Sequence, residues 1–107
     1  MTNSRQKGAR GEREVAKILR EHGYDARRGQ QYSGANGDAD VVGIPGIHIE
    51  VKRTESFRMY EALQQAVRDA RGGEKPVVVH RKNDFPWVAV MDLEDFLQLL
   101  KEAGYGD

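Results

Sequence analysis

Two acidic residues and a lysine have the types and the spacing of a site for a divalent cation. Asp40 precedes one β-branched run, and Glu50 and Lys52 lie in the next run, over residues 46–53. Because side chains alternate between the two faces of a strand, Glu50 and Lys52 should share a face about 7 Å apart. If the turn at residues 43–46 pairs the two runs antiparallel, Asp40 arrives beside Glu50. Two carboxylates so placed repel each other unless a cation joins them.

The chemistry that such a site could perform is hydrolysis of a phosphodiester. Mg²⁺ and Mn²⁺ prefer oxygen ligands, which makes Asp40, Glu50 and the carbonyl of Val51 the candidate ligands. The ion would polarise the phosphodiester, lower the pKa of a bound water and neutralise developing charge. Lys52 would orient that water or stabilise the pentacovalent phosphorus. The simpler readings are a surface salt bridge between Glu50 and Lys52 and a turn role for Asp40.

Alternating helical and β-branched patterns indicate the elements that would position these residues. Val15, Ile18 and Leu19 share one face at helical spacing. Residues 75–80 form an apolar run that is typical of a strand buried on both faces. The order of elements predicts an α/β fold with a mixed central sheet flanked by helices. We expect helices over residues 9–22, 58–71 and 92–104, strands over residues 24–28, 39–42, 46–53, 75–80 and 86–91, and a loop over residues 29–38.

Length and composition limit the class of protein. A chain of 107 residues with 38% hydrophobic and 32% charged residues suits one soluble domain with a modest core. The absence of cysteine excludes disulfides, thiolate zinc sites and cysteine nucleophiles. No apolar run approaches the roughly 18 to 20 residues of a membrane-spanning helix, and the start of the chain lacks a signal-peptide pattern. We therefore expect a single domain over residues 1–107, in the cytoplasm and without membrane contact.

Basic residues gather in the first third of the chain. The totals balance at 17 basic and 17 acidic residues, but residues 1–35 hold eight basic and four acidic ones. This asymmetry suits a surface that meets phosphates, although a scatter of solvated charges would give the same counts. We expect residues 1–8 to form a flexible basic arm. Contacts to a nucleic-acid backbone are expected from Arg5, Lys7, Arg10, Arg13, Arg27, Arg28 and Arg53.

Asp40 followed by Glu50-Val51-Lys52 on the next strand resembles the signature of the PD-(D/E)XK nucleases. The short αβββαβ order resembles the Holliday junction resolvases of the archaeal and phage type in that superfamily, over most of the chain. The resemblance implies a restriction-endonuclease-like core and a Mg²⁺-dependent endonuclease that makes paired nicks in four-way DNA junctions, with Mn²⁺ as a substitute and no organic cofactor. It also implies 5′-phosphate and 3′-hydroxyl products, in a bacterial, archaeal or phage-infected cell. One departure is Ala39, where the signature has proline.

The resemblance also assigns roles outside the two strands. Glu12, after Gly11 in the first helix, matches a glutamate that completes the metal site, and its simpler reading is a solvated helix residue. Ser33, in the loop before Asp40, matches a serine that assists catalysis. Gln65 is preferred to Gln64 as the glutamine that recurs on the second helix. Asp38 competes with Asp40 for the metal, and His48 is either a group that supports the site or an exposed histidine.

A resolvase must cut two symmetry-related strands, and one domain of this size cannot span a four-way junction. The resemblance therefore implies a twofold homodimer. Phe96, Leu97 and Leu100 are expected on the buried side of the last helix, and residues 86–91 and 96–100 are the candidates for the dimer contact. Two other functions stay open. One is a nuclease that acts on flaps, nicks or duplex DNA without junction selectivity, and the other is a non-catalytic DNA-binding module of the same fold.

Overall fold

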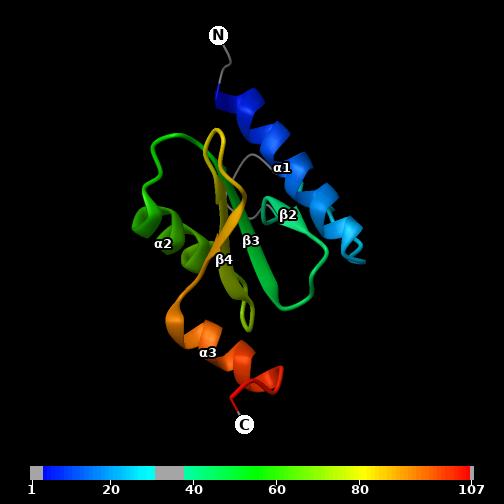
Figure 1. The fold of residues 1–107 in the computed structure, drawn as a ribbon, viewed down its shortest axis with the longest axis vertical. Coiled ribbons are helices and arrows are strands. Elements are labelled where there is room, and N and C mark those ends of the chain that lie inside the picture. The colour runs from blue at the N-terminus through cyan, green and yellow to red at the C-terminus, as the bar shows by residue number, and fades with distance from the viewer. Residues whose placement is uncertain (1–3, 31–37, 107) are drawn as a thin grey trace.

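The computed structural model describes residues 4–30 and 38–106, and their elements follow the expected order (Figure 1). Over these residues, no helix has both the length and the apolar character needed to cross a membrane. The elements are α1 (Ser4–Glu21), β1 (Arg27–Arg28), β2 (Val41–Val42), β3 (Ile47–Arg53), α2 (Met59–Asp69), β4 (Lys75–Arg81), β5 (Val88–Val90) and α3 (Leu93–Glu102).

The five strands form one mixed sheet in the order β1-β2-β3-β4-β5. Strands β3 and β4 are parallel, with Ile49 opposite Val77, and the other neighbouring pairs are antiparallel. A parallel pair needs a long crossover, which here contains α2. Residues 76–78 of β4 are buried on both faces, as its apolar run predicted, whereas residues 79–81 are half-buried. The α/β architecture with a mixed sheet between helices is therefore confirmed.

Helices α1 and α2 cover opposite faces of the sheet (Figure 1). Val15 and Ala16 of α1 pack on Ile49 and Val51 of β3, whereas Ala62 and Ala66 of α2 pack on Val78 of β4. The odd-numbered residues of β3 thus fill the core beneath α1. By the alternation of a strand, His48, Glu50 and Lys52 lie on the α2 side.

The beginning of the chain differs from expectation, because residues 4–8 belong to α1 and the predicted flexible arm is wrong for them. Gly8 lowers helix propensity by about 1 kcal/mol, which one residue in a long helix tolerates. The Lys7 ammonium lies 3.5 Å from the Glu55 carboxylate, so the start of the helix is also tied to the segment after β3. The first strand is shorter than expected and is confined to Arg27–Arg28.

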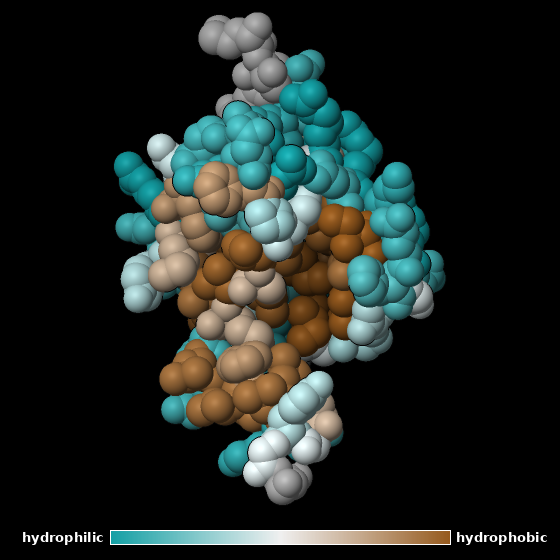
Figure 2. All heavy atoms as spheres, in the orientation of Figure 1, coloured by the Kyte–Doolittle hydropathy of each residue, from teal (hydrophilic) through white to brown (hydrophobic). Residues whose placement is uncertain are grey.

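Helix α3 begins where the sequence predicted, since the carboxylate of Asp92 accepts a hydrogen bond from the backbone N–H of Glu94 at 3.2 Å. The prediction of its buried side is wrong: Phe96 and Leu97 are 46% and 41% exposed, and no residue of α3 is buried. The helix extends beyond the end of the sheet (Figure 1), and Figure 2 shows apolar side chains gathered there. Helical periodicity predicts which face is apolar, but it does not supply a partner for that face.

Candidate active site

Two acidic side chains meet at the junction of β2 and β3. The strands pair antiparallel with Val41 opposite Ile49, which places Asp40 across from Glu50. Asp40 Oδ2 accepts a hydrogen bond from the backbone N–H of Val51 at 2.8 Å, and the carboxyl groups of Asp40 and Glu50 are close enough to perturb each other's pKa. Glu50 is only 6% exposed. The hairpin register thus delivers the pair that the spacing predicted.

This pair resists carrying two negative charges. Burial, and then the hydrogen bond and the charge of Glu50, raise the pKa of Asp40 to about 7, although the Val51 N–H and Lys52 oppose this. Burial also raises the pKa of Glu50, against the hydrogen bond from Asp40 and the charge of Lys52. A shared proton is therefore needed near neutral pH, and a cation in its place would allow both groups to ionise.

Glu12 approaches the pair from α1. Its helix packs closely on the end of β3, because a Cβ added at Gly11 would lie 2.8 Å from Cβ of Arg53. Burial and then the charge of Asp40 raise the pKa of Glu12, and Arg28 opposes this change. Glu12 Oε1 accepts a hydrogen bond from Arg28 Nε at 3.0 Å. Arg28 therefore keeps Glu12 close to the pair, but the Glu12 carboxylate is bound to the Arg28 guanidinium and is not available to a cation.

The donor set fits a hard divalent cation through two of its three acidic members. Across residues 4–30 and 38–106, no three acidic, histidine or cysteine side chains are arranged to hold a metal ion. Half-buried Asp40 and buried Glu50 nevertheless supply two adjacent acidic oxygen ligands, which is the kind of ligand that Mg²⁺ or Mn²⁺ prefers. Glu12 could join them after it separates from Arg28.

Lys52 and Gln65 line one pocket of about 300 Å³ between the end of β3 and the start of α2. The positive charge of Lys52 opposes the rise in the pKa values of Asp40 and Glu50, so its ammonium acts on the same pair. Gln64 instead lines a groove on another side of α2, with Tyr60 and Leu63 among its neighbours. The geometry therefore groups Gln65, and not Gln64, with Lys52.

The remaining predicted residues make other contacts or lie on other surfaces. Arg53 faces α1, where its Nη2 donates to Asn83 Oδ1 at 2.6 Å and where it lines a pocket of about 390 Å³ with Lys7, Arg10 and Arg81. It thus lies on the opposite sheet face from Lys52. Arg13, Arg27 and Arg28 are exposed, and Arg5 lies in the first turns of α1. Ser33 lies outside the described residues. The carboxylate of Asp38 accepts a hydrogen bond from the Gln30 backbone N–H at 3.1 Å.

His48 contacts the pair directly, which agrees with the first of its two sequence readings, a group that supports the site. It is 4% exposed, so the reading of an exposed histidine is wrong, and its Nε2 lies 2.7 Å from Glu50 Oε1. Strand alternation had already placed His48 on the same face as Glu50. The sequence did not show that His48 is buried. Strand alternation gives the same pattern for a buried histidine and for an exposed one on the polar face.

Comparison of the chain with models of protein families finds a match over nearly its whole length. The model of a family described as "Phage putative PDDEXK endonuclease" matches residues 3–105. No curated protein matches the chain. The matched range contains Asp40, Glu50 and Lys52, which have the acidic, acidic and lysine types that the family's designation names.

Proposed function

Since the chain belongs to the phage PDDEXK endonuclease family, we propose that it is a Mg²⁺-dependent DNA endonuclease that resolves Holliday junctions as a homodimer. Nucleases of the PDDEXK type generally depend on a divalent metal. The observation that carries the proposal is the pair formed by half-buried Asp40 and buried Glu50, with Lys52 two residues beyond Glu50 on the same strand.

Asp40 and Glu50 are the proposed ligands, completed by Glu12 and the carbonyl of Val51. A bound cation would supply charge neutralisation at the phosphodiester and activation of water. Asp40 is fixed for this role by the Val51 N–H, so its orientation is set by the backbone of β3. The site requires Glu12 to exchange Arg28 for the ion, and the released guanidinium could then meet a phosphate of the substrate.

Lys52 is the proposed group that acts on the attacking water. Its ammonium can donate hydrogen bonds to that water and to the phosphate oxygens on which charge develops. Gln65 lies in the same pocket and can orient the water or a phosphate oxygen through its amide. Ser33 is proposed to assist from the loop before Asp40. Cleavage on this pattern leaves a 5′-phosphate and a 3′-hydroxyl.

The proposed junction substrate requires two sites in one assembly. The proposal of a homodimer is supported by exposed apolar side chains: Val88 of β5 is 48% exposed, and Phe96 and Leu97 of α3 are 46% and 41% exposed. A second copy would bury this surface and place two sites in a twofold arrangement. Contacts to the DNA backbone are proposed from Arg5, Lys7, Arg10, Arg13, Arg27, Arg28 and Arg53.

Cleavage assays on matched substrates test this proposal. The wild type is incubated with Mg²⁺, with a mobile four-way junction and, separately, with linear duplexes of the same sequences. Paired symmetrical nicks in the junction alone support a resolvase. Equal cutting of linear duplex, flaps or nicked DNA favours the broader nuclease, and binding without cutting in Mg²⁺ or Mn²⁺ favours a non-catalytic module.

Three variants test the assigned residues. Asp40→Asn, Glu50→Gln and Lys52→Ala should still bind junction DNA but should cut it at least about 100-fold more slowly, which is the scale of losing one charge-stabilising group. Lys75→Ala is a matched lysine control, because Lys75 donates to Gln98 at 3.0 Å at the other end of the sheet. Full activity of the Lys52 variant would refute its assigned role.

A further inference from the structure

Glu50 lies beside one other buried polar side chain, that of His48. Among residues 6–30 and 38–106, His48 and Glu50 are the polar side chains that are buried, at 4% and 6% exposure. They lie two residues apart on the same face of β3, and His48 Nε2 is 2.7 Å from Glu50 Oε1. When Glu50 is ionised its carboxylate only accepts hydrogen bonds, so Nε2 is then the donor in this contact.

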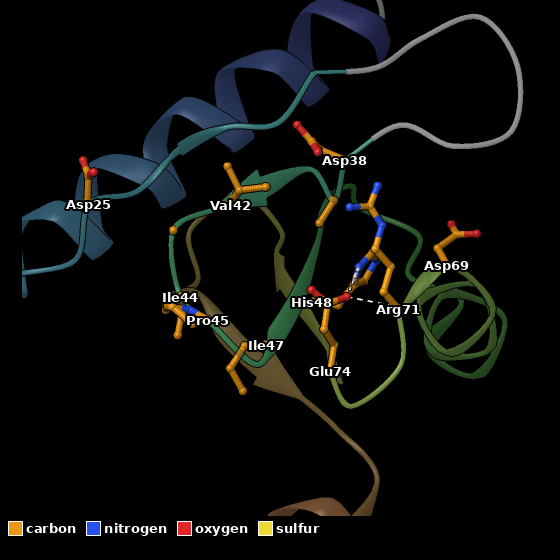
Figure 3. Close-up of a pocket in the computed structure, with 12 residues that line it drawn as sticks. Asp25, Asp38, Val42, Ile44, Pro45, Ile47, His48, Asp69, Arg71 and Glu74 are labelled. Atoms are coloured by element: carbon orange, nitrogen blue, oxygen red, sulfur yellow. Dashed lines mark hydrogen bonds and ion pairs between the residues drawn. The ribbon is translucent and has the colours of Figure 1, made fainter.

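A second carboxylate lies on the other side of the His48 ring. His48 Nδ1 lies 3.8 Å from Glu74 Oε1, and this same oxygen accepts a hydrogen bond from the backbone N–H of Arg71 at 2.8 Å. Figure 3 shows His48, Glu74 and Arg71 gathered at one side of a pocket, with the side chains of Ile44 and Ile47 at another. The imidazole therefore lies between a proposed metal ligand, to which it is hydrogen-bonded, and the turn that precedes β4.

We propose that His48 is a positioning residue for Glu50, one that binds Oε1 and thereby leaves the second carboxylate oxygen for Asp40 and the cation. This inference rests on the proposed function, because it assumes that Glu50 is a metal ligand. His48 contacts neither substrate nor metal in this role. It acts through Glu50 alone.

A contribution to folding stability does not explain why His48 and Glu50 are buried together. A buried charged or polar pair is expensive to desolvate, and two well-packed apolar residues would serve a core as well or better. Glu50 meanwhile has a flexible side chain and a repelling neighbour in Asp40, which would turn it away when both are ionised. A hydrogen bond from a rigid imidazole opposes that movement. Groups that orient a metal ligand from behind typically change metal affinity or activity 10- to 100-fold when removed.

Two substitutions separate the hydrogen bond from the packing. His48→Phe keeps a ring and removes the donor, whereas His48→Gln keeps an N–H donor near the position of Nε2. Mn²⁺ affinity is measured by calorimetry on the DNA-free protein, and kcat and KM are measured for cleavage. We expect His48→Phe to weaken Mn²⁺ binding at least about tenfold and to lower kcat with little change in KM. His48→Gln should recover affinity to within about threefold of the wild type.

The control is His22→Phe, which changes an exposed histidine at the end of α1 and should keep wild-type values. Should His48→Phe fail to fold, the wild type still provides a test through the ¹⁵N spectrum of its imidazoles. Only three histidines need assignment. Addition of Mg²⁺ should shift the ring nitrogen signals of His48 and leave those of His22 unchanged, and an unchanged His48 signal would overturn the inference.

The outcomes also separate this inference from the function on which it rests. Wild-type Mn²⁺ affinity and kcat in His48→Phe overturn the positioning role and leave the nuclease standing. The expected loss and recovery of affinity, in a protein that cuts no DNA, support the positioning role and overturn the nuclease. A wild type that binds no Mn²⁺ overturns both.

Discussion

Replacing Asp40 by asparagine should isolate what it costs the metal-free protein to keep a second carboxylate beside Glu50. The asparagine oxygen can accept from the Val51 N–H, which lies 2.8 Å from Asp40 Oδ2, and its amide can donate to Glu50. The exchange therefore removes the ionisation and keeps the contacts. We expect this variant to be more stable than the wild type at alkaline pH when no metal is present.

The size and sign of the effect follow from the pKa of Asp40, which burial first and Glu50 second raise from 3.8 to about 7. Between these two values the folded protein keeps a proton that the unfolded chain has released, so wild-type stability falls as the pH rises through this window. A displacement of about three pH units, at about 1.36 kcal/mol for each, corresponds to about 4 kcal/mol when the fall is complete. Between pH 5 and pH 8 the same relation gives about 2 to 3 kcal/mol.

Urea unfolding in EDTA, followed by the fluorescence of Trp87, measures this difference at each pH. The free energy of unfolding of Asp40→Asn minus that of the wild type should grow from pH 5 to pH 8. Asp38→Asn is the matched control, because it changes a carboxylate two residues away that accepts from Gln30, and it should follow the wild-type pH dependence. A difference between Asp40→Asn and wild type that stays constant over this range refutes the reasoning.

Three further outcomes are expected. At pH 8, millimolar Mg²⁺ should raise the Tm of the wild type and leave that of Asp40→Asn nearly unchanged in thermal unfolding, because a cation replaces the shared proton only where two carboxylates ionise; equal shifts would contradict a site at this pair. Arg28→Gln should bind Mn²⁺ more tightly in calorimetry, since Glu12 loses the guanidinium 3.0 Å away, and weaker binding would assign Arg28 a supporting role at the site. The double variant Phe96→Ser with Leu97→Ser should sediment as a monomer where the wild type sediments as a dimer. Because both side chains are exposed, the urea midpoint of the monomer should change little. A large loss of stability would instead place α3 in the core.

The sequence predicted the parts of the site that depend on local geometry. Alternation along β3 placed Glu50 and Lys52 on one face, and the short turn before β3 placed Asp40 opposite Glu50. These relations hold within one hairpin, so period and turn length are sufficient to predict them.

The parts that were missed depend on contacts between distant segments. The pairing of Glu12 with Arg28 joins α1 to the edge strand, and the burial of His48 depends on how α2 and the turn at Glu74 close over β3. Exposure of Phe96 has a similar origin, because an amphipathic helix predicts an apolar face and does not specify what covers it. Pattern along the chain carries no information on these arrangements.

The ten-residue separation of Asp40 and Glu50 also bears on the order in which the protein assembles. Their hairpin closes a short loop, which costs far less chain entropy than the parallel pairing of β3 with β4 across α2. The two carboxylates that repel each other, Asp40 and Glu50, are therefore brought together by the contact that can form earliest, the hairpin of β2 and β3. Glu12 and Gln65 come from helices on either side of the sheet and join the site only when those helices dock. The ability to bind a metal ion should therefore appear late in folding, after Asp40 and Glu50 have already been brought together.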